Sequence, residues 1–214
     1  MKNVITIDGP SGSGKGSVSK LLAKRLGYKY LDTGALYRAV AWKVREENMD
    51  PDDKDSLVQL LKNITIGFSE DRIFVDGIDV TSAIRTAEIG ELSSRISAQP
   101  VVRDGLYTLQ REMGMQGSVV IEGRDTGTVI FPESENKFFL DASIEERARR
   151  RFEELKDKDP EASLTRTIED IRKRDTRDSS RESSPLVKSD DMIYIDSTDL
   201  NIDEVVAKIL EKLT

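Results

Sequence analysis

The stretch from Gly9 to Ser17 combines glycines, a lysine and hydroxyl side chains in a pattern that can bind phosphate. Glycines let a loop curl so that successive backbone N–H groups point at phosphate oxygens, and a following helix adds the positive end of its dipole. Lys15 supplies a positive charge for the β- and γ-phosphates, and a hydroxyl at the helix start can hold Mg2+. The strict pattern has Ser or Thr directly after Lys, whereas Gly16 intervenes here and Ser17 follows it. The alternative is a glycine-rich turn with an incidental lysine. The position between a strand and a helix favours nucleotide binding by Gly9, Pro10, Ser11, Gly12, Ser13, Gly14, Lys15, Gly16 and Ser17.

A second candidate lies at the end of an apolar run further along the chain. Glu122 stands where proteins with such a phosphate-binding loop place a carboxylate that holds Mg2+ directly or through water. A structural hydrogen bond is an equally good interpretation of this residue. The predicted metal ligands are therefore Ser17 and Glu122, with the role of Glu122 left open.

Composition excludes several kinds of chemistry. The 214 residues include no cysteine and no histidine, so a thiolate nucleophile, an ordinary zinc site and a Ser-His-Asp triad are ruled out. A formal net charge of −7 argues against a general nucleic-acid binder. No apolar stretch approaches the roughly 18 residues of a membrane span, and we expect a cytoplasmic protein with no membrane partner.

The elements that must position these residues alternate between short apolar strands and amphipathic helices. This pattern is typical of an α/β protein with a parallel sheet, whose strands present polar groups at their carboxyl ends. Helices are predicted after the Gly9 loop, at about 89–96, from Pro100, and at the end of the chain. The five predicted strands are Val4 to Asp8, Tyr28 to Asp32, Ser118 to Glu122, Lys137 to Asp141 and Met192 to Asp196.

Two segments depart from this alternation. Residues 64–80 read as short antiparallel strands with a tight turn at Asp76-Gly77, which predicts a small β insertion. Residues from about 152 to 185 are rich in charge and poor in apolar anchors, and Pro160 and Pro185 interrupt them. They form either a solvated pair of surface helices or a lid that closes over a bound nucleotide.

Arginines decide between the protein classes that share a phosphate-binding loop. A GTPase would carry an Asn-Lys-x-Asp guanine reader, which is absent, and a mechanical ATPase is usually larger. An enzyme that joins two polyanions needs arginines to offset their repulsion. The candidate arginines lie near strand ends or in charged loops: Arg38, Arg103, Arg124, Arg174 and Arg181. Each of them alone could instead form a surface ion pair worth 0 to about 1 kcal/mol.

Several runs together resemble the bacterial cytidylate kinase family. They are Leu31-Asp-Thr-Gly-Ala-Leu-Tyr-Arg38, Ile84-Arg85-Thr86, Glu122-Gly-Arg-Asp-Thr-Gly-Thr-Val129, Phe139-Leu-Asp-Ala142 and Arg174-Asp-Thr-Arg-Asp-Ser-Ser-Arg181, besides the Gly9 loop. The resemblance covers nearly the whole chain in order. It implies a nucleoside monophosphate kinase fold, with a five-stranded parallel core, an acceptor-binding lobe at about 37–114 that carries the β insertion, and a lid at about 152–185.

The resemblance also implies roles for individual residues. Arg38, Arg124 and Arg181 match positions that hold the acceptor phosphate, which suits guanidinium groups. Ser94, Arg103 and Asp125 match positions that read cytosine; a carboxylate accepts from the 4-amino group, although Asp125 could instead pair with Arg124 or Arg103 to shape its loop. The remaining implied contacts are the sugar-binding Arg174 and Asp178, the pocket residues Asp32, Thr33 and Tyr37, and the catalytic residues Lys15, Arg147 and Arg151.

The expected reaction is ATP + CMP → ADP + CDP, with Mg2+ and with dCMP as a second acceptor. No histidine base is required, because the second pKa of a nucleotide phosphate lies near 6 and the attacking oxygen is already ionised at neutral pH. We expect a monomer whose partners are small nucleotides. A different kinase acceptor, such as UMP or a non-nucleotide, and a nucleotide-binding regulator with poor hydrolysis remain alternatives.

Overall fold

The computed structural model describes residues 1–69, 72–156 and 162–214. The chain divides into two compact units. Unit 1 comprises Met1–Leu31 and Gly114–Thr214, and unit 2 comprises Asp32–Met113. Part of the predicted lid, including Pro160, lies outside the described residues. None of the helices within the described ranges has the length and apolar character needed to cross a membrane.

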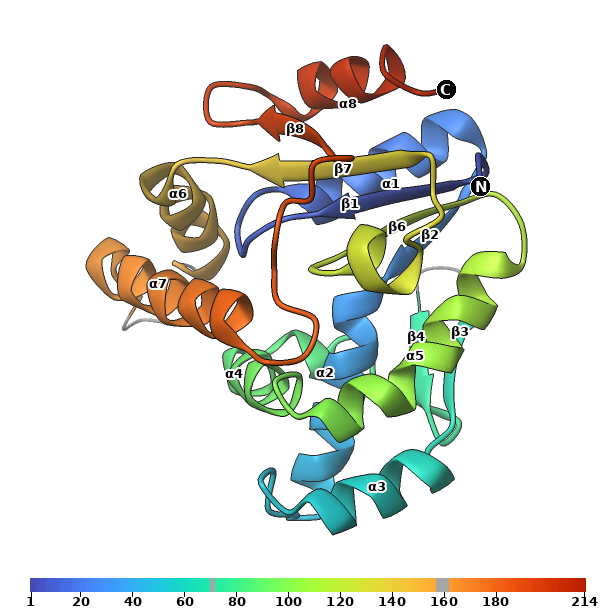
Figure 1. Cartoon of the computed structure of the whole chain (residues 1–214). Coiled ribbons are helices and arrows are strands. Elements are labelled where there is room, and N and C mark those ends of the chain that lie inside the picture. Colours follow the sequence, from blue (N-terminus) through green and yellow to red (C-terminus); the bar gives the residue numbers. More distant parts are fainter. Residues whose placement is uncertain (70–71, 157–161) are drawn as a thin grey trace. The chain divides into compact units, whose positions relative to one another are not determined.

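A five-stranded sheet forms the centre of unit 1, in the order β2-β6-β1-β7-β8 (Figure 1). The pairings of β1 with β6, β1 with β7, and β7 with β8 are all parallel. The five strands confirm the predicted set to within one residue at each end: β1 Val4–Asp8, β2 Lys29–Asp32, β6 Val119–Gly123, β7 Asn136–Asp141 and β8 Ile193–Asp196.

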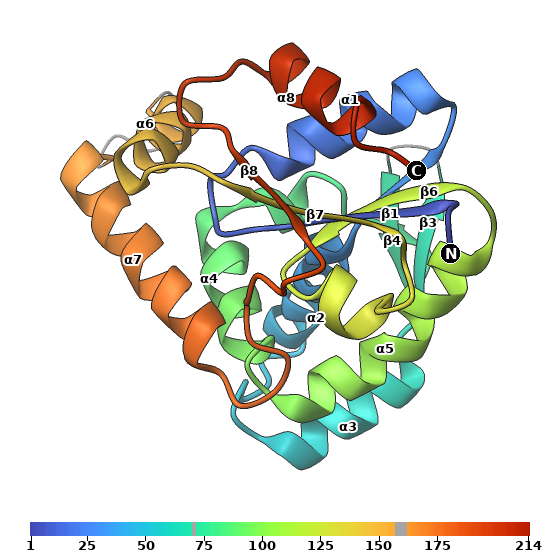
Figure 2. The same ribbon diagram turned by 45° about the horizontal axis from the view of Figure 1, so that its top comes forward.

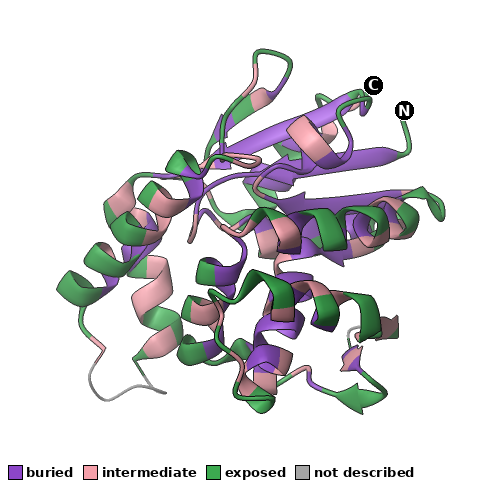
Figure 3. Ribbon diagram, turned by 60° about the horizontal axis from the view of Figure 1, so that its bottom comes forward, coloured by how far each residue is buried: buried purple, intermediate pink, exposed green. Residues whose placement is uncertain are grey.

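These strands form because they carry continuous apolar runs that are covered on both faces, as parallel sheets require. Every residue of the central strands β1 and β6 is buried, and β7 is buried except at its last residue. These inner strands are purple in Figure 3, whereas the outer strands β2 and β8 are only partly buried. On one face α1 (Lys15–Leu26) packs beside α8 (Ile202–Leu210). Gly27 ends α1 in the left-handed conformation, with its N–H bonded to carbonyls of the last turn.

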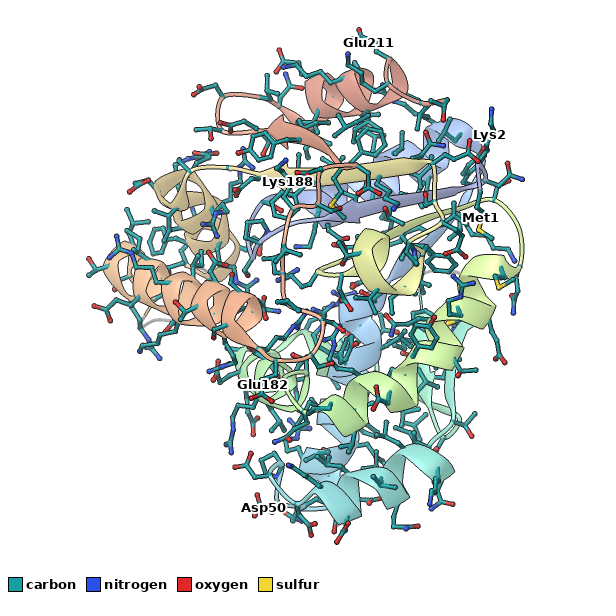
Figure 4. The ribbon with its side chains drawn as sticks, in the orientation of Figure 1. Met1, Lys2, Asp50, Glu182, Lys188 and Glu211 are labelled. Carbon is teal, nitrogen blue, oxygen red and sulfur yellow. The ribbon has the colours of Figure 1, made fainter. Side chains whose placement is uncertain are left out.

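Two charged helices of unit 1, α6 (Ile144–Leu155) and α7 (Leu164–Ser180), pack against each other (Figure 2). The side chain of Ser143 caps α6 by accepting from the N–H of Glu146, while the Glu146 carboxylate accepts from Arg149 and Arg150. A long connection then leads from α7 to β8, with Glu182 and Lys188 marked along it in Figure 4. A short helical turn, η2 (Thr126–Ile130), follows β6.

Unit 2 consists of helices around a small antiparallel sheet of order β3-β4-β5. Its apolar core joins α2 to the sheet through side chains such as Leu36, Val40, Ile73 and Val75, all of which are buried. The elements are α2 Thr33–Glu46, α3 Lys54–Asn63, β3 Ile66–Ser69, β4 Arg72–Val75, β5 Ile78–Asp79, η1 Ala83–Arg85, α4 Ala87–Ile96 and α5 Pro100–Met115. The predicted β insertion is therefore present, and α5 begins at Pro100 as expected.

The turn predicted at Asp76-Gly77 joins β4 to β5. Both residues have positive φ, 51° and 81°, which is the backbone of the type I′ turn that matches the twist of a hairpin. The Asp76 carboxylate also accepts from the N–H of Thr65 at 2.9 Å and pairs with Lys43 at 2.8 Å. These contacts tie the hairpin to the segment before β3 and to α2.

Candidate active site

The predicted phosphate-binding loop connects β1 to α1 and has the backbone that its glycines permit. Gly12 and Gly14 have φ of 79° and 84°, in the left-handed region that favours glycine. A Cβ at Gly12 would lie 2.9 Å from the carbonyl oxygen of Arg147, so α6 approaches the loop closely. Gly14 is the N-cap of α1 and has no side chain to cap it, which leaves amides of the first turn available for an anion.

Lys15 is buried at the start of α1, and its Nζ donates to the carbonyl oxygen of Pro10 at 3.0 Å. Burial, and then repulsion from Arg124, lower the pKa of Lys15 to about 7, while Glu122 opposes this change and Arg174 adds to it. Removing an ammonium from water and placing it near guanidinium groups costs free energy. An anion bound in the loop would offset that cost, so the charge distribution here favours phosphate.

Glu122 lies beside the residue that departs from the strict loop pattern. Its Oε1 accepts from the hydroxyl of Tyr30 at 2.8 Å, and its side chain is buried. A Cβ at Gly16 would lie only 2.9 Å from the same oxygen. Gly16, in the first turn of α1, thus leaves the room that this carboxylate occupies.

The residues at this end of α1 fit a magnesium ion bound together with a nucleotide. Ser17 is exposed in the first turn of α1, and the Glu122 carboxylate lies against the adjacent residue Gly16. Mg2+ commonly takes one or two carboxylates, substrate phosphates and water rather than a complete set of protein ligands. One hydroxyl and one carboxylate next to a phosphate-binding loop match this donor set.

Within unit 1, a cluster of arginines and aspartates connects the loop after β6 with α7 and its C-terminal end. Arg124 donates to the Asp178 carboxylate at 2.7 Å, and both side chains are largely buried. Arg181 lies 3.7 Å from Asp125 and 4.0 Å from Asp178, and its Nε donates to the carbonyl oxygen of Ser184. Burial alone would raise the pKa of Asp178, but Arg124, Arg174 and Arg181 lower it. The structure thus brings Arg124, Asp125, Arg174, Asp178 and Arg181 together within unit 1. Their roles in binding the acceptor stay a prediction.

A fully buried aspartate anchors the loop that carries Arg124 and Asp125. Asp8, the last residue of β1, accepts from the N–H and hydroxyl of Thr126 and from the N–H of Gly127, at 2.7 to 2.9 Å. A Cβ at Gly127 would meet the hydroxyl oxygen of Thr6 at 2.7 Å. Thr126 and Gly127 therefore dock the start of η2 onto the strand that leads into the phosphate-binding loop.

The arginines of α6 differ in their surroundings. Arg147 is buried, donates to the carbonyl oxygens of Ala142 and Ser11, and pairs with Asp175 of α7 at 2.5 Å. It therefore links the phosphate-binding loop to α7. Arg151 pairs with Glu154 on the surface, at 2.7 Å.

Arg150 also reaches the phosphate-binding loop, which the sequence analysis did not predict. It donates to the carbonyl oxygen of Ser13 at 3.4 Å and to the hydroxyl and carbonyl of Ser197. The signal for it was its spacing of three residues from Arg147, because such residues share a helix face as residues four apart do. Tyr30 and Asp8 were also missed, since their partners lie about 90 and 120 residues away in the chain.

In unit 2, the predicted residues Asp32 and Arg38 meet at the start of α2. The Asp32 carboxylate caps the helix by accepting from the N–H of Ala35 at 3.0 Å, and it also accepts from Arg38 at 2.8 Å and Arg85 at 3.2 Å. Burial alone would raise the pKa of Asp32, but the two arginines and the amide lower it. Asp32 thus holds two guanidinium groups in place, and Arg85 is a member of this group that was not among the predicted site residues. Thr33, also predicted, is buried as the first residue of α2.

The other predicted residues of unit 2 lie on α2, α4 and α5. The guanidinium of Arg103 stacks over the ring of Tyr37, 5.3 Å from its centroid, and donates to the carbonyl oxygen of Ser97 at 3.2 Å. Ser94 is buried, and its carbonyl oxygen accepts from the Ser97 hydroxyl. Arg103, Tyr37 and Ser94 therefore belong to one packed region of unit 2, tied together through Ser97.

The parallel sheet with this strand order, the glycine-rich loop between β1 and α1, and the guanidinium groups around Lys15 define a phosphotransferase with a phosphate-binding loop. Comparison with known proteins narrows this class. The model of the cytidylate kinase family matches residues 5–214, and the chain belongs to that family of kinases.

Individual proteins support the assignment. The chain is 50% identical over 210 residues to the cytidylate kinase of Geobacter sulfurreducens. The matched region covers 96% of this chain and 90% of that protein. It is 46% identical over 218 residues to the cytidylate kinase of Thermodesulfovibrio yellowstonii, and the matched region covers 100% of this chain and 98% of that protein. Among solved structures, an uncharacterized protein from Eubacterium ventriosum shares the fold, with a TM-score of 0.57 and 16% identity over 98% of this chain and 97% of that one.

Proposed function

We propose that the protein transfers the γ-phosphoryl group of ATP to CMP, and also to dCMP, to form the nucleoside diphosphate and ADP. The observation that carries this proposal is the positive charge gathered around the phosphate-binding loop of unit 1, where Arg124 and Arg174 lie near enough to lower the pKa of Lys15. Such a distribution of positive charge favours a bound anion and suits two phosphate-bearing substrates. Membership of the cytidylate kinase family selects CMP as the acceptor.

The donor is held by the residues from Gly9 to Ser17. The loop amides bind the phosphates of ATP, and Lys15 stabilises the negative charge that develops as the γ-phosphoryl group leaves. Ser17 and Glu122 would hold Mg2+, which when bound neutralises phosphate charge. Arg147 would hold the loop and α7 together through its contacts with Ser11 and Asp175. Arg151 would be one of the lid arginines that contact the donor.

Contacts to the acceptor follow from the family resemblance and suit the chemistry of each side chain. In unit 1, Arg124 and Arg181 would bind the CMP phosphate, Asp125 would accept from the cytosine 4-amino group, and Arg174 and Asp178 would bind the sugar. In unit 2, Arg38 would bind the phosphate, Ser94 and Arg103 would contact the base, and the pocket would be completed by Asp32, Thr33 and Tyr37.

The reaction itself needs little covalent chemistry from the protein. An ionised phosphate oxygen of CMP forms a bond to the γ-phosphorus, while the bond from that phosphorus to the oxygen bridging to the β-phosphate breaks and ADP leaves. Since the attacking oxygen has already lost its proton near neutral pH, no general base is needed. Catalysis then depends on alignment and electrostatic stabilisation by Lys15 and the arginines.

The remaining proposals concern organisation and setting. The acceptor-binding lobe would span about 37–114. The segment of about 152–185 would act as the lid; the structure describes it apart from residues 157–161. We infer that the enzyme acts as a monomer in the cytoplasm, where its nucleotide substrates are found.

A coupled assay of ADP release with CMP, dCMP, UMP, AMP or no acceptor tests the proposal. We expect the highest kcat/KM with CMP, activity with dCMP, much lower activity with UMP and AMP, and little ADP release without acceptor. Equal ADP release with and without an acceptor would instead indicate a nucleotide-hydrolysing regulator.

A further inference from the structure

The departure of the phosphate-binding loop from the strict pattern has a structural counterpart in Glu122. A Cβ at Gly16 would lie 2.9 Å from Oε1 of Glu122, closer than real Cβ atoms come to other heavy atoms. Only glycine therefore fits at this position while that carboxylate keeps its place. The end of a glutamate side chain could usually move away, so what holds Glu122 decides whether the contact matters.

Tyr30 supplies that restraint. Its hydroxyl donates to the same Oε1 at 2.8 Å, and the Glu122 side chain is buried. Tyr30 comes from β2, Glu122 from β6 and Gly16 from α1, and β2 and β6 are neighbours in the sheet. The tyrosine thus holds one oxygen of the Glu122 carboxylate from the neighbouring strand.

We propose that Tyr30 is a positioning residue that holds the Glu122 carboxylate against Gly16, and that Gly16 is required because this carboxylate occupies the space of a side chain. The inference rests on the proposed role of Glu122 toward Mg2+ and ATP. It explains why the hydroxyl of the loop stands one residue later, at Ser17, since a side chain directly after Lys15 would displace Glu122.

The consequence concerns metal-assisted binding of the donor rather than binding of the phosphates to the loop. Loop amides and Lys15 keep their place when Tyr30 loses its hydroxyl, whereas Oε1 of Glu122 loses the hydrogen bond that holds it against Gly16. We therefore expect ATP affinity without metal to persist and the gain in affinity on adding Mg2+ to fall. A purely structural role for Tyr30 would change both affinities together, or the thermal stability.

The first test compares Tyr30→Phe with Tyr28→Phe, a control that removes the same hydroxyl two residues earlier in the chain. Isothermal titration calorimetry measures ATP affinity in EDTA and in Mg2+, and thermal unfolding reports stability. Tyr30→Phe should lower the Mg2+-dependent gain by roughly tenfold, as for other groups that orient a metal ligand, while its affinity in EDTA and its Tm stay near those of the wild type. Tyr28→Phe should keep the full gain.

The second test combines Gly16→Ala with Glu122→Asp. The added methyl group should displace Glu122 and abolish most of the Mg2+-dependent gain, and shortening the acid by one methylene should relieve the contact. The double variant should then bind ATP with Mg2+ several-fold more tightly than Gly16→Ala alone.

The outcomes separate this inference from the proposed function. The inference would be overturned if Tyr30→Phe kept the full Mg2+-dependent gain in ATP affinity. It would also be overturned if the double variant bound ATP with Mg2+ no more tightly than Gly16→Ala. Either result would leave the kinase proposal standing. A wild-type ATP affinity that does not respond to Mg2+ would overturn the metal site and the inference together, while the CMP assay would still judge the reaction.

Discussion

Replacing the buried Asp8 should change how the stability of the protein depends on pH. Burial, opposed by the hydrogen bond from the amide of Gly127, raises the pKa of Asp8 from the ordinary 3.8 to about 6. Between these values the native protein keeps a proton that the unfolded chain has lost, so its stability falls as the pH rises. At about 1.4 kcal/mol per pH unit the whole interval amounts to about 3 kcal/mol. This part of the stability is fully present below about pH 4 and is lost as the pH passes 6.

Urea unfolding followed by far-UV circular dichroism at pH 4, 5, 6 and 7 measures this effect. Asp8→Asn removes the titrating group, so the free energy of unfolding of the wild type minus that of the variant should decrease by about 2 to 3 kcal/mol from pH 4 to pH 7. Asp190→Asn, which removes an exposed carboxylate, is the matched control. A flat difference, or one that increases with pH, would refute the reasoning and would mean that the bonds from Thr126 and Gly127 outweigh burial.

Three further predictions concern activity and motion. Lys15→Ala should lower kcat by at least two orders of magnitude with an unchanged circular dichroism spectrum, and turnover within about threefold of the wild type would contradict its role at the phosphates. Asp125→Asn should narrow the ratio of kcat/KM for CMP over UMP by roughly 5- to 150-fold, since one base contact discriminates by about 1 to 3 kcal/mol; an equal loss for both would mean that Asp125 serves only its ion pair with Arg181. Amide hydrogen exchange in 164–180 should slow when a bisubstrate analogue binds, and unchanged exchange there with protection elsewhere would reject the lid.

The strands and the hairpin could be predicted because their signals are local. Buried parallel strands are continuous apolar runs, and β1 was predicted with its observed bounds. The I′ turn at Asp76-Gly77 follows from two residues that tolerate positive φ. The order of the strands was not predicted, because no periodicity encodes which strands are neighbours; it comes from the structure.

The candidate site was predictable only in part. Lys15 and Glu122 stand out because they follow a recognisable loop and an apolar strand. The bond from Tyr30 to Glu122 was not predictable, because the two residues are 92 positions apart and neither type is distinctive at a strand end. For the same reason the sequence left open whether Asp125 pairs with Arg124 or Arg103, and the structure shows an ion pair with Arg181, at 3.7 Å.

The fate of the γ-phosphoryl group tests the central proposal most directly. The enzyme is incubated with CMP, Mg2+ and ATP whose γ-phosphate carries oxygen-18. Phosphorus NMR of the separated products then shows which phosphate carries the label. The proposal predicts that the label appears in the β-phosphate of CDP, in step with the ADP formed. Label recovered as inorganic phosphate, with CMP unchanged, would contradict it.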